Sequence, residues 1–443
     1  GLIHKGPEVV EHLLRDVIID PSIQEAPQVV TVSTWQREGL DDDKKEVVAA
    51  ALGSTGMFAV EGPPGTGKTT FIAELVAQEI ARNPRARILI SSQTNVALDN
   101  ALVRIIDFID PSRVVRLADR SGSKVSDEAK ELLLEQQVEQ WRQKTILKSR
   151  LAFESWCADR GVKASDLESA GVLHQIADRK EAEIAYKATA DKIQQRIIEA
   201  KGLEPSELLS EEEVNELKDE LQDIKDKQTQ ARRDYRELEK RADKKLARNA
   251  GLDIEKASPE DLRNYANETF APLGNDRAKV DLYVSWSLRL QRGQEYLEAI
   301  VNQTQVLGGT CIGIARHKEI RSLQFDLCIV DEASKATATE TLVPLVRSKR
   351  WVMVGDQRQL PPFQEDALRD KALLEEFGLD ENELRSTLFD RMLSGLPDHS
   401  KKSLRVQRRM TEAIGEMVSE CFYDSQLVSR GPAPMDEILG VLT

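Results

Sequence analysis

One glycine-rich run, Gly62-Pro63-Pro64-Gly65-Thr66-Gly67-Lys68-Thr69-Thr70, constrains the fold more than any other part of the chain. It follows an apolar run at 57–60 that is typical of a buried strand, and it precedes a stretch at 71–82 that predicts a helix. A glycine-rich turn between a strand and a helix, ending in Lys-Thr, is the phosphate-loop pattern. Its glycines let backbone N–H groups surround phosphate oxygens, and the helix N-terminus adds partial positive charge.

The phosphate-loop pattern predicts a nucleoside triphosphate site and assigns roles within it. Lys68 is expected to reach the β- and γ-phosphates, and the Thr69 hydroxyl is expected to ligate Mg²⁺. The candidate ATP-binding residues are Gly62, Pro63, Gly65, Thr66, Gly67, Lys68, Thr69 and Thr70.

Strand-like and helix-like stretches alternate on both sides of a long polar block. After the phosphate loop, strands are expected at 87–92 and 113–117, with a helix at 96–108 between them. Strand-like runs return at 309–313, 325–330 and 351–354. This alternation predicts an α/β fold with a parallel sheet and crossover helices, interrupted by an insertion.

The interrupting block, residues 126–304, shows almost no strand pattern and is rich in helix-forming residues. Two heptad seams separated by the break at 202–206 predict an antiparallel coiled-coil hairpin over about 176–248. Helices lying flat on the body as a small bundle are the alternative. The seams consist of Val214, Leu217, Leu221, Ile224, Gln228, Ala231, Tyr235, Leu238 and Ala242, and, more weakly, of Ile176, Tyr186, Ala190, Ile193, Ile197 and Ala200.

Composition excludes several classes of protein. The 443 residues carry 62 Lys+Arg and 76 Asp+Glu, a net charge of −14, which gives no overall basic footprint but leaves a local strand-binding face open. The four cysteines are far apart, which fits neither a disulfide scaffold nor a Cys-rich zinc site. No run is long and apolar enough to span a membrane, and none reads as a signal peptide. A reducing, cytoplasmic location is expected, with nucleoid or nucleus also open.

Polar residues follow two further apolar strands. Asp331 and Glu332 come directly after the strand at 325–330, at the edge where α/β sheets bind their ligands. Asp331 is suited to hold Mg²⁺ through water, and Glu332 to orient or deprotonate the attacking water. Gln359 follows the strand at 351–354 and could report on the γ-phosphate.

Six segments in this order resemble superfamily 1 helicases of the up-frameshift type. They are the phosphate loop at 62–70, Thr-Asn-Val-Ala at 94–97, Asp-Glu-Ala-Ser at 331–334, Gly-Asp-Gln-Arg-Gln-Leu-Pro-Pro at 355–362, Leu-Phe-Asp-Arg at 388–391 and Gln-Arg-Arg-Met at 407–410. The trailing Phe422-Tyr423 is similar as well. The resemblance covers roughly 40–120 and 305–430.

The resemblance implies an ATP-dependent helicase or translocase with a RecA-like sheet, moving 5′ to 3′ on single-stranded DNA or RNA, with ATP and Mg²⁺ as cofactors. It implies that Lys68, Asp331, Glu332, Gln359 and Arg409 are catalytic, with Gln359 as sensor and Arg409 as a γ-phosphate contact. It also implies that Thr94, Asn95 and Thr310 touch the backbone of the single strand. Such contacts are insensitive to base sequence and sensitive to salt.

The expected domains follow from these patterns. Residues 1–36 are read as the tail of an upstream module, 37–125 and 305–430 as two parts of the first RecA-like lobe, 126–304 as the helical insertion, and 431–443 as the start of a linker to a second lobe.

The chain departs from the family at three places. The stretch 40–45, Leu-Asp-Asp-Asp-Lys-Lys, stands where the family has an adenine-reading glutamine, and Arg408 stands where it has a tyrosine. The chain also ends about 30 residues after Met410, before a second lobe with its arginine finger. As a fragment of this kind, the chain alone is expected to be weakly active or inactive.

Two other functions remain open from the sequence. An ABC-type or structural-maintenance ATPase shares the order of phosphate loop, coil and carboxylate strand, but the serine and glutamine of its signature are missing near 307–309. A nucleotide-gated scaffold, whose hairpin docks a protein partner, is the second alternative.

Overall fold

The structure is a computed structural model, and it describes residues 8–118, 122, 124–200, 211–242, 251–292, 296–362 and 386–431. Contacts divide the chain into two units, residues 1–140 with 294–443, and residues 141–293. Residues 126–140 and 294–304, which the sequence patterns place in the insertion, therefore make their contacts with the first unit. Each unit is described separately below.

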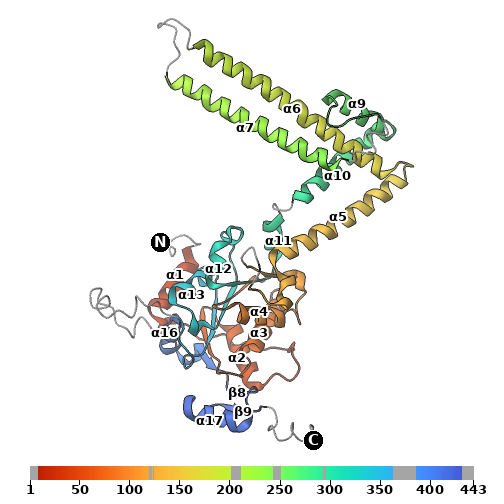
Figure 1. The fold of residues 1–443 in the computed structure, drawn as a ribbon. Helices are drawn as coiled ribbons and strands as arrows, with labels where there is room; N and C mark the ends of the chain where they lie inside the picture. The colour runs from red at the N-terminus through yellow and green to blue at the C-terminus, as the bar shows by residue number, and fades with distance from the viewer. Residues whose placement is uncertain are drawn as a thin grey trace, which may run out of the picture. The chain divides into compact units, whose positions relative to one another are not determined.

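The first unit is built on a sheet flanked by helices (Figure 1). Its seven described strands all run parallel, in the order β3-β4-β2-β5-β6-β1-β7. This confirms the predicted α/β fold. The strands are β1 (Met57–Glu61), β2 (Ile88–Ser92), β3 (Val114–Arg116), β4 (Val306–Thr310), β5 (Leu327–Asp331), β6 (Trp351–Gly355) and β7 (Lys401–Ser403); β8 (Val406–Gln407) and β9 (Val428–Ser429) form a separate parallel pair.

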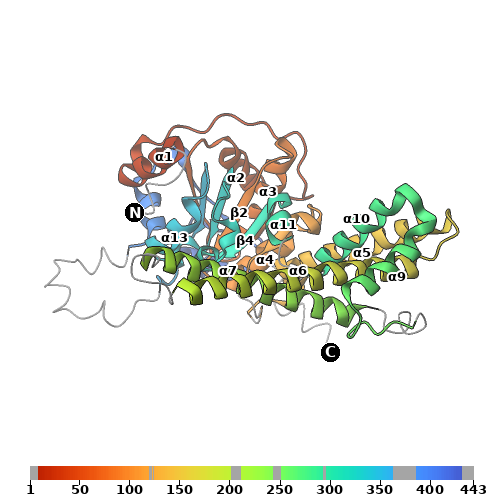
Figure 2. The ribbon, with the colours of Figure 1, turned by 90° about the horizontal axis from the view of Figure 1, so that it is seen from above.

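Successive side chains of each strand point to opposite faces of the sheet, and both faces are buried. In β1, Met57 and Ala59 belong to one apolar core, whereas Phe58 and Val60 belong to the other. Because both faces are buried, the strands appear in the sequence as unbroken apolar runs. Figure 2 shows the strands seen from above, between α2 and α3 on one side and α13 on the other.

Helices of the first unit cover both faces of the sheet. One core contains residues of α2 (Asp42–Gly53), α3 (Lys68–Arg82) and α4 (Asn95–Ile105). The other contains residues of α1 (Glu8–Ile19), α11 (Leu297–Gln303), α12 (Cys311–Arg316), α13 (Ala338–Leu345) and α16 (Leu388–Gly395). The last helix, α17 (Glu412–Phe422), follows β8.

The strand expected at 309–313 is wrong in extent. Strand β4 ends at Thr310, whose hydroxyl accepts a hydrogen bond from the Gly313 N–H at 3.2 Å and so begins α12 at the next residue. A threonine at this position caps a helix because it satisfies a backbone donor of the first turn.

In its described residues the second unit is helical. The described α-helices are α5 (Leu134–Ala158), whose first residues belong to the first unit, α6 (Ala164–Ala200), α7 (Glu211–Arg241), α9 (Pro259–Phe270) and α10 (Arg277–Arg292). Phe153 of α5 stacks on Tyr283 of α10 with ring centroids 3.9 Å apart. Lys180 of α6 pairs with Glu239 of α7 at 2.9 Å and donates to the Ile254 carbonyl at 2.8 Å.

Helices α6 and α7 lie side by side and run antiparallel (Figure 1). Lys225 bonds Gln194, whereas Arg232, further along α7, bonds Glu183, earlier in α6. Ile193, Ile197 and Leu217 form a buried cluster between the two helices, with Leu221 and Ile224 against it. The expected turn at 202–206 lies outside the described residues, so the coiled-coil hairpin remains a prediction.

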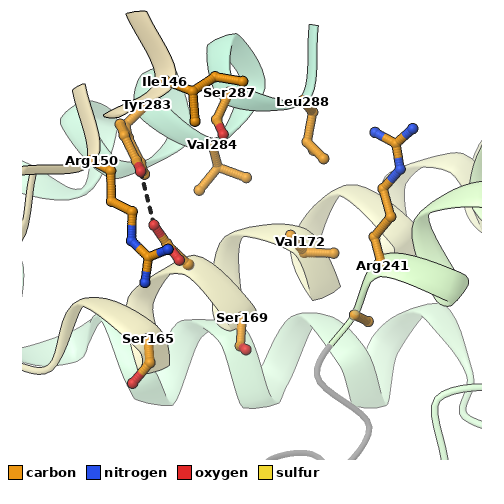
Figure 3. A pocket seen from close by; sticks show the side chains of 12 residues that line it. Ile146, Arg150, Ser165, Ser169, Val172, Arg241, Tyr283, Val284, Ser287 and Leu288 are labelled. Atoms are coloured by element: carbon orange, nitrogen blue, oxygen red, sulfur yellow. Dashed lines mark hydrogen bonds between the residues drawn. The ribbon is translucent and has the colours of Figure 1, made fainter. Parts of the chain in front are cut away.

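A pocket of about 340 Å³ opens among α5, α6, α7 and α10 (Figure 3). On its wall the Tyr283 hydroxyl donates to Glu168 at 2.8 Å, the dashed line in Figure 3. Burial and this hydrogen bond raise the pKa of Tyr283 well above its usual value. The pocket thus encloses a carboxylate that is already hydrogen-bonded.

No helix in the described part of the chain combines the length and apolarity that crossing a membrane requires.

The neighbours Ile197 and Ile198 offer a matched test of the α6–α7 contact, because they are 8% and 63% exposed. We expect Ile197→Asp to lower the free energy of unfolding of the helical unit by about 2–4 kcal/mol, since it buries a charge in an apolar contact. Ile198→Asp should change it by less than about 0.5 kcal/mol. Urea unfolding followed by circular dichroism measures both, and equal effects would contradict the observed packing.

Candidate functional site

Parallel pairing brings the carboxyl ends of five strands to one edge of the sheet. Glu61 of β1 lies opposite Gly355 of β6, and Ser92 of β2 lies between Asp331 of β5 and Thr310 of β4. All predicted catalytic and strand-contacting residues except Arg409 lie at or just beyond these strand ends. In open α/β sheets ligands bind at this edge.

The phosphate loop has the backbone geometry that an anion site needs. Gly65 and Gly67 have φ of +77° and +81°, which side chains with a Cβ rarely adopt. Gly67 is the N-cap of α3 and has no side chain to bond the first-turn N–H groups, which leaves them for phosphate oxygens. The Thr66 hydroxyl donates to the Pro63 carbonyl at 2.7 Å and closes the turn.

Lys68 lies across the loop between a carbonyl and a carboxylate. Its ammonium donates to the Gly62 carbonyl at 2.9 Å and is 3.5 Å from Glu332. A Cβ on Gly62 would lie 2.4 Å from the Lys68 side chain, so only glycine leaves room for it. The lysine is therefore held at the place where the loop would bring phosphates, with one anionic partner that a phosphate could replace.

Glu332 has a φ of +52°, in the left-handed region that residues other than glycine rarely occupy. This conformation costs about 1 kcal/mol or more and often accompanies a functional position. Lys335 pairs with Glu332 at 2.8 Å. Burial acts to raise the pKa of Glu332, but the positive charges of Lys68 and Lys335 outweigh it and hold the pKa below its usual value. Glu332 is therefore ionised at neutral pH.

Asp331 is 2% exposed and forms no ion pair with another described residue, and its environment fits a divalent metal ion. Burial and then the charge of Glu332 raise the pKa of Asp331 to about 7, against the opposing effect of Lys68. A cation beside it would reverse this by favouring the ionised form. The described residues contain no group of three or more His, Cys, Asp or Glu that could hold a metal alone. This suits Mg²⁺, which needs few protein ligands when phosphates and water supply the rest.

Gln359 is held by a buried aspartate that the sequence patterns did not single out as functional. Its amide nitrogen donates to Asp356 at 2.9 Å, and the Tyr423 hydroxyl donates to the same carboxylate oxygen at 2.7 Å. The Asp356 N–H in turn donates to the Ser334 hydroxyl at 3.1 Å, which links the Gln359 loop to the Asp-Glu-Ala-Ser segment.

The segment at 407–410 lies against the phosphate loop. The Arg408 N–H donates to the Gly65 carbonyl at 2.9 Å, and a Cβ on Gly65 would lie 2.7 Å from the Arg409 Cβ. The Gln407 side-chain oxygen accepts from the backbone of Arg409 and Met410 at 3.0 and 2.8 Å. Arg409 is exposed, and its guanidinium has no ion-pair partner among the described residues. The Arg409 backbone thus lies beside the phosphate loop, and its guanidinium forms no ion pair with another described residue.

The departure at 40–45 forms a charge cluster beside the loop. Asp41 pairs with Lys44 at 2.8 Å and with Arg408. Burial acts to raise the pKa of Asp41, but the hydrogen bonds from Arg408 and Lys44 outweigh it and lower the pKa to about 2. The Lys44 side chain packs against Gly67: a Cβ on Gly67 would lie 3.0 Å from the Lys44 Cε. The two departures from the family are therefore in direct contact, through the ion pair between Asp41 and Arg408.

The candidate strand contacts lie on the adjacent carboxyl ends of β2 and β4. Thr94 and Thr310 are the N-caps of α4 and α12, and their hydroxyls accept from Ala97 and Gly313 N–H groups at 3.3 and 3.2 Å. Asn95 receives a hydrogen bond from the buried Arg116 at 2.7 Å. The structure brings all three residues to the same side of Asp331.

The sequence patterns did not predict the residues that hydrogen-bond to or pair with the site residues. Lys335 follows the Asp-Glu-Ala-Ser segment directly, so its i, i+3 spacing from Glu332 was a readable signal. The partnerships of Asp356 with Tyr423, of Asp41 with Arg408 and of Arg116 with Asn95 join distant segments and leave no local pattern.

Comparisons with known proteins agree with this geometry. The family model described as an AAA domain matches residues 39–364. An uncharacterized ATP-dependent helicase of Methanocaldococcus jannaschii is 24% identical over 88% of this chain and 45% of its own length. The DNA replication ATP-dependent helicase/nuclease of Gallus gallus is 36% identical over 30% of this chain and 12% of its own. Regulator of nonsense transcripts 1 of Dictyostelium discoideum is 32% identical over 37% of this chain and 11% of its own. The chain thus spans less than half the length of these relatives.

The raised pKa of Asp331 predicts a stability that depends on pH. Because the folded state binds this proton more tightly than the unfolded chain, stability falls as pH rises from about 4 to 7. With Mg²⁺ chelated and no nucleotide, Asp331→Asn should therefore raise the free energy of unfolding by up to about 4 kcal/mol above pH 7, and by less as pH falls towards 4. Urea unfolding at several pH values measures this gain.

Asp326, at the opposite end of β5, is the control for this measurement. Burial acts to raise the pKa of Asp326, but Lys349 and a backbone hydrogen bond outweigh it and lower the pKa. Asp326→Asn should therefore destabilise the protein above pH 4 and lose this effect at lower pH. A gain for Asp331→Asn that does not change with pH would contradict the assigned charge environment.

The contact of Gly65 with Arg409 predicts the effect of a methyl group. Gly65→Ala adds a Cβ 2.7 Å from Arg409, whereas Gly39→Ala, at a similar φ of +71°, meets nothing within 4 Å. Both should cost about 1 kcal/mol of stability from the positive φ. Only Gly65→Ala should also weaken binding of a fluorescent ATP analogue, about tenfold or more, and equal affinities would contradict the close approach.

Proposed function

The chain belongs to the AAA domain family and is a superfamily 1 helicase of the up-frameshift type, and from this membership we propose that it is part of an ATP-driven motor that moves 5′ to 3′ along single-stranded DNA or RNA. The observation that carries the proposal is the single sheet edge. At this edge Asp331–Glu332 follow β5, the phosphate loop follows β1 two strands away, and Thr94, Asn95 and Thr310 lie at the ends of β2 and β4 on the other side of Asp331.

The residues of the nucleotide half suggest how ATP would be bound and cleaved. Backbone N–H groups of the loop and Lys68 would hold the phosphates. Thr69 and Asp331 would hold Mg²⁺, which when bound would neutralise charge on the phosphates. Glu332, which is ionised, would orient the attacking water and accept a proton from it. Gln359 lies in the loop after β6 and Arg409 lies beside the phosphate loop, and both would respond to the γ-phosphate.

The residues of the strand-binding half suggest how a single strand would be held. Thr310 is the last residue of β4 and Thr94 lies two residues after β2. Each is the N-cap of the helix that follows, so both hydroxyl groups lie at the same edge. Such groups bind phosphate oxygens without reading bases. The relatives include a DNA replication helicase and a regulator of nonsense transcripts, so both DNA and RNA remain candidate substrates.

The test is ATP hydrolysis with and without single-stranded oligonucleotides. We expect slow hydrolysis by this chain, stimulated several-fold by a single strand. Lys68→Ala should weaken ATP-analogue binding, and Glu332→Gln should retain binding while lowering turnover about 100-fold or more.

Lys349→Ala is the matched control for these variants. Lys349 pairs with Asp326 at the opposite edge of the sheet, so its loss should leave both binding and turnover unchanged. Hydrolysis that is indifferent to single strands would contradict the motor and favour the nucleotide-gated scaffold. Full activity of Lys68→Ala or Glu332→Gln would overturn the site assignment.

A protein partner on α6 is the second candidate function. Ile184 and Ile198 are 55% and 63% exposed, and their spacing of two heptads places them on one face of the helix. Exposed apolar residues aligned in this way are suited to contact another protein. This role is compatible with a motor.

A further inference from the structure

The orientation of the Asn95 side chain is set by its hydrogen bond to Arg116. The Arg116 guanidinium donates to one end of the Asn95 amide at 2.7 Å. A guanidinium has only donors, so the atom it contacts must be the amide oxygen. The NH₂ group of Asn95 therefore points the other way, and no described residue accepts a hydrogen bond from it.

Arg116 itself is held rigidly and cannot reach a ligand. Its side chain is 1% exposed, and its Nε donates to Asp99 at 2.8 Å, while another nitrogen donates to the Leu117 carbonyl. The second oxygen of Asp99 accepts the Ser126 N–H at 2.8 Å. Asp99 is 2% exposed, so the pair is desolvated and fixed in one geometry.

We propose that Arg116 is a positioning residue for single-strand binding, which fixes the Asn95 amide so that its NH₂ group donates to a phosphate oxygen of the strand. The inference rests on the proposed function, because it concerns the same strand-binding edge. Thr94, next to Asn95, and Thr310, on the adjoining strand, lie at this edge. A flipped amide would present its oxygen to the phosphate and repel it, so an amide free to rotate would bind less well.

Asn95 variants test the orientation directly, by fluorescence anisotropy of a labelled oligothymidylate or oligouridylate at fixed salt. Asn95→Ala removes the donor and should lower affinity about fivefold. Asn95→Asp keeps the bond to Arg116 but turns an anionic oxygen outward, so it should lower affinity further, by about 20-fold or more. Asn100→Ala and Asn100→Asp, at an exposed position of α4, should change affinity less than twofold.

Arg116→Gln tests whether the arginine acts through Asn95. It should lower strand affinity about as much as Asn95→Ala, and the double variant should lose no more than either single one. Affinity for an ATP analogue should be unchanged in each. If Arg116→Gln does not fold, the comparison of Asn95→Asp with Asn95→Ala still decides the orientation.

Three outcomes would overturn the inference. In the first, Asn95→Asp binds strands as tightly as Asn95→Ala. In the second, Arg116→Gln binds strands as tightly as the wild-type chain. In the third, the Arg116→Gln substitution weakens strand binding equally in the wild-type chain and in Asn95→Ala. Each of these leaves the motor proposal standing. Failure of the wild-type chain to bind either oligonucleotide, while it still binds the ATP analogue, would overturn both.

Discussion

Parallel pairing of the strands β4-β2-β5-β6-β1 is the constraint on which the rest of this molecule depends. It forces the carboxyl ends of all five to one edge, so residues as far apart as Lys68 and Glu332 come within 3.5 Å. The two apolar cores on the faces of the sheet leave this edge as the place where polar residues collect. A nucleotide and a single strand would then act on the same rigid element.

The edge carries charged groups that a nucleotide and a divalent cation are suited to pair with. Asp331 has a pKa raised to about 7, chiefly by burial, and Arg409 has no ion-pair partner among the described residues. Among the described residues, the Lys68 ammonium contacts the Gly62 carbonyl at 2.9 Å and the Glu332 carboxylate at 3.5 Å. Phosphates would pair with Lys68 and Arg409, and a divalent cation would pair with Asp331. Burial of the ionised Asp331 lowers the free energy of unfolding, and such a cost is common at binding sites.

Part of this site could be predicted from the sequence, for a physical reason. The phosphate loop and Asp331–Glu332 are local patterns, each made of a strand and the turn that follows it, so neighbouring residues suffice to locate them. Asp41 and Arg408 are 367 positions apart, and Asp356 and Tyr423 are 67 apart. Such partnerships depend on how strands pair and how the chain returns to the edge, which no local pattern encodes. The strand expected at 309–313 failed because one hydroxyl, that of Thr310, starts a helix.

Hydrogen exchange of the backbone amides tests most directly whether one edge binds both ligands. A non-hydrolysable ATP analogue with Mg²⁺ should slow exchange in residues 62–70 and 331–335, and a single-stranded oligonucleotide should slow it in residues 92–97 and 310–314. Residues 85–87 and 325–326, at the opposite edge of the sheet, should exchange at an unchanged rate with either ligand. Protection by the oligonucleotide at that opposite edge, or only within residues 141–293, would contradict the shared site.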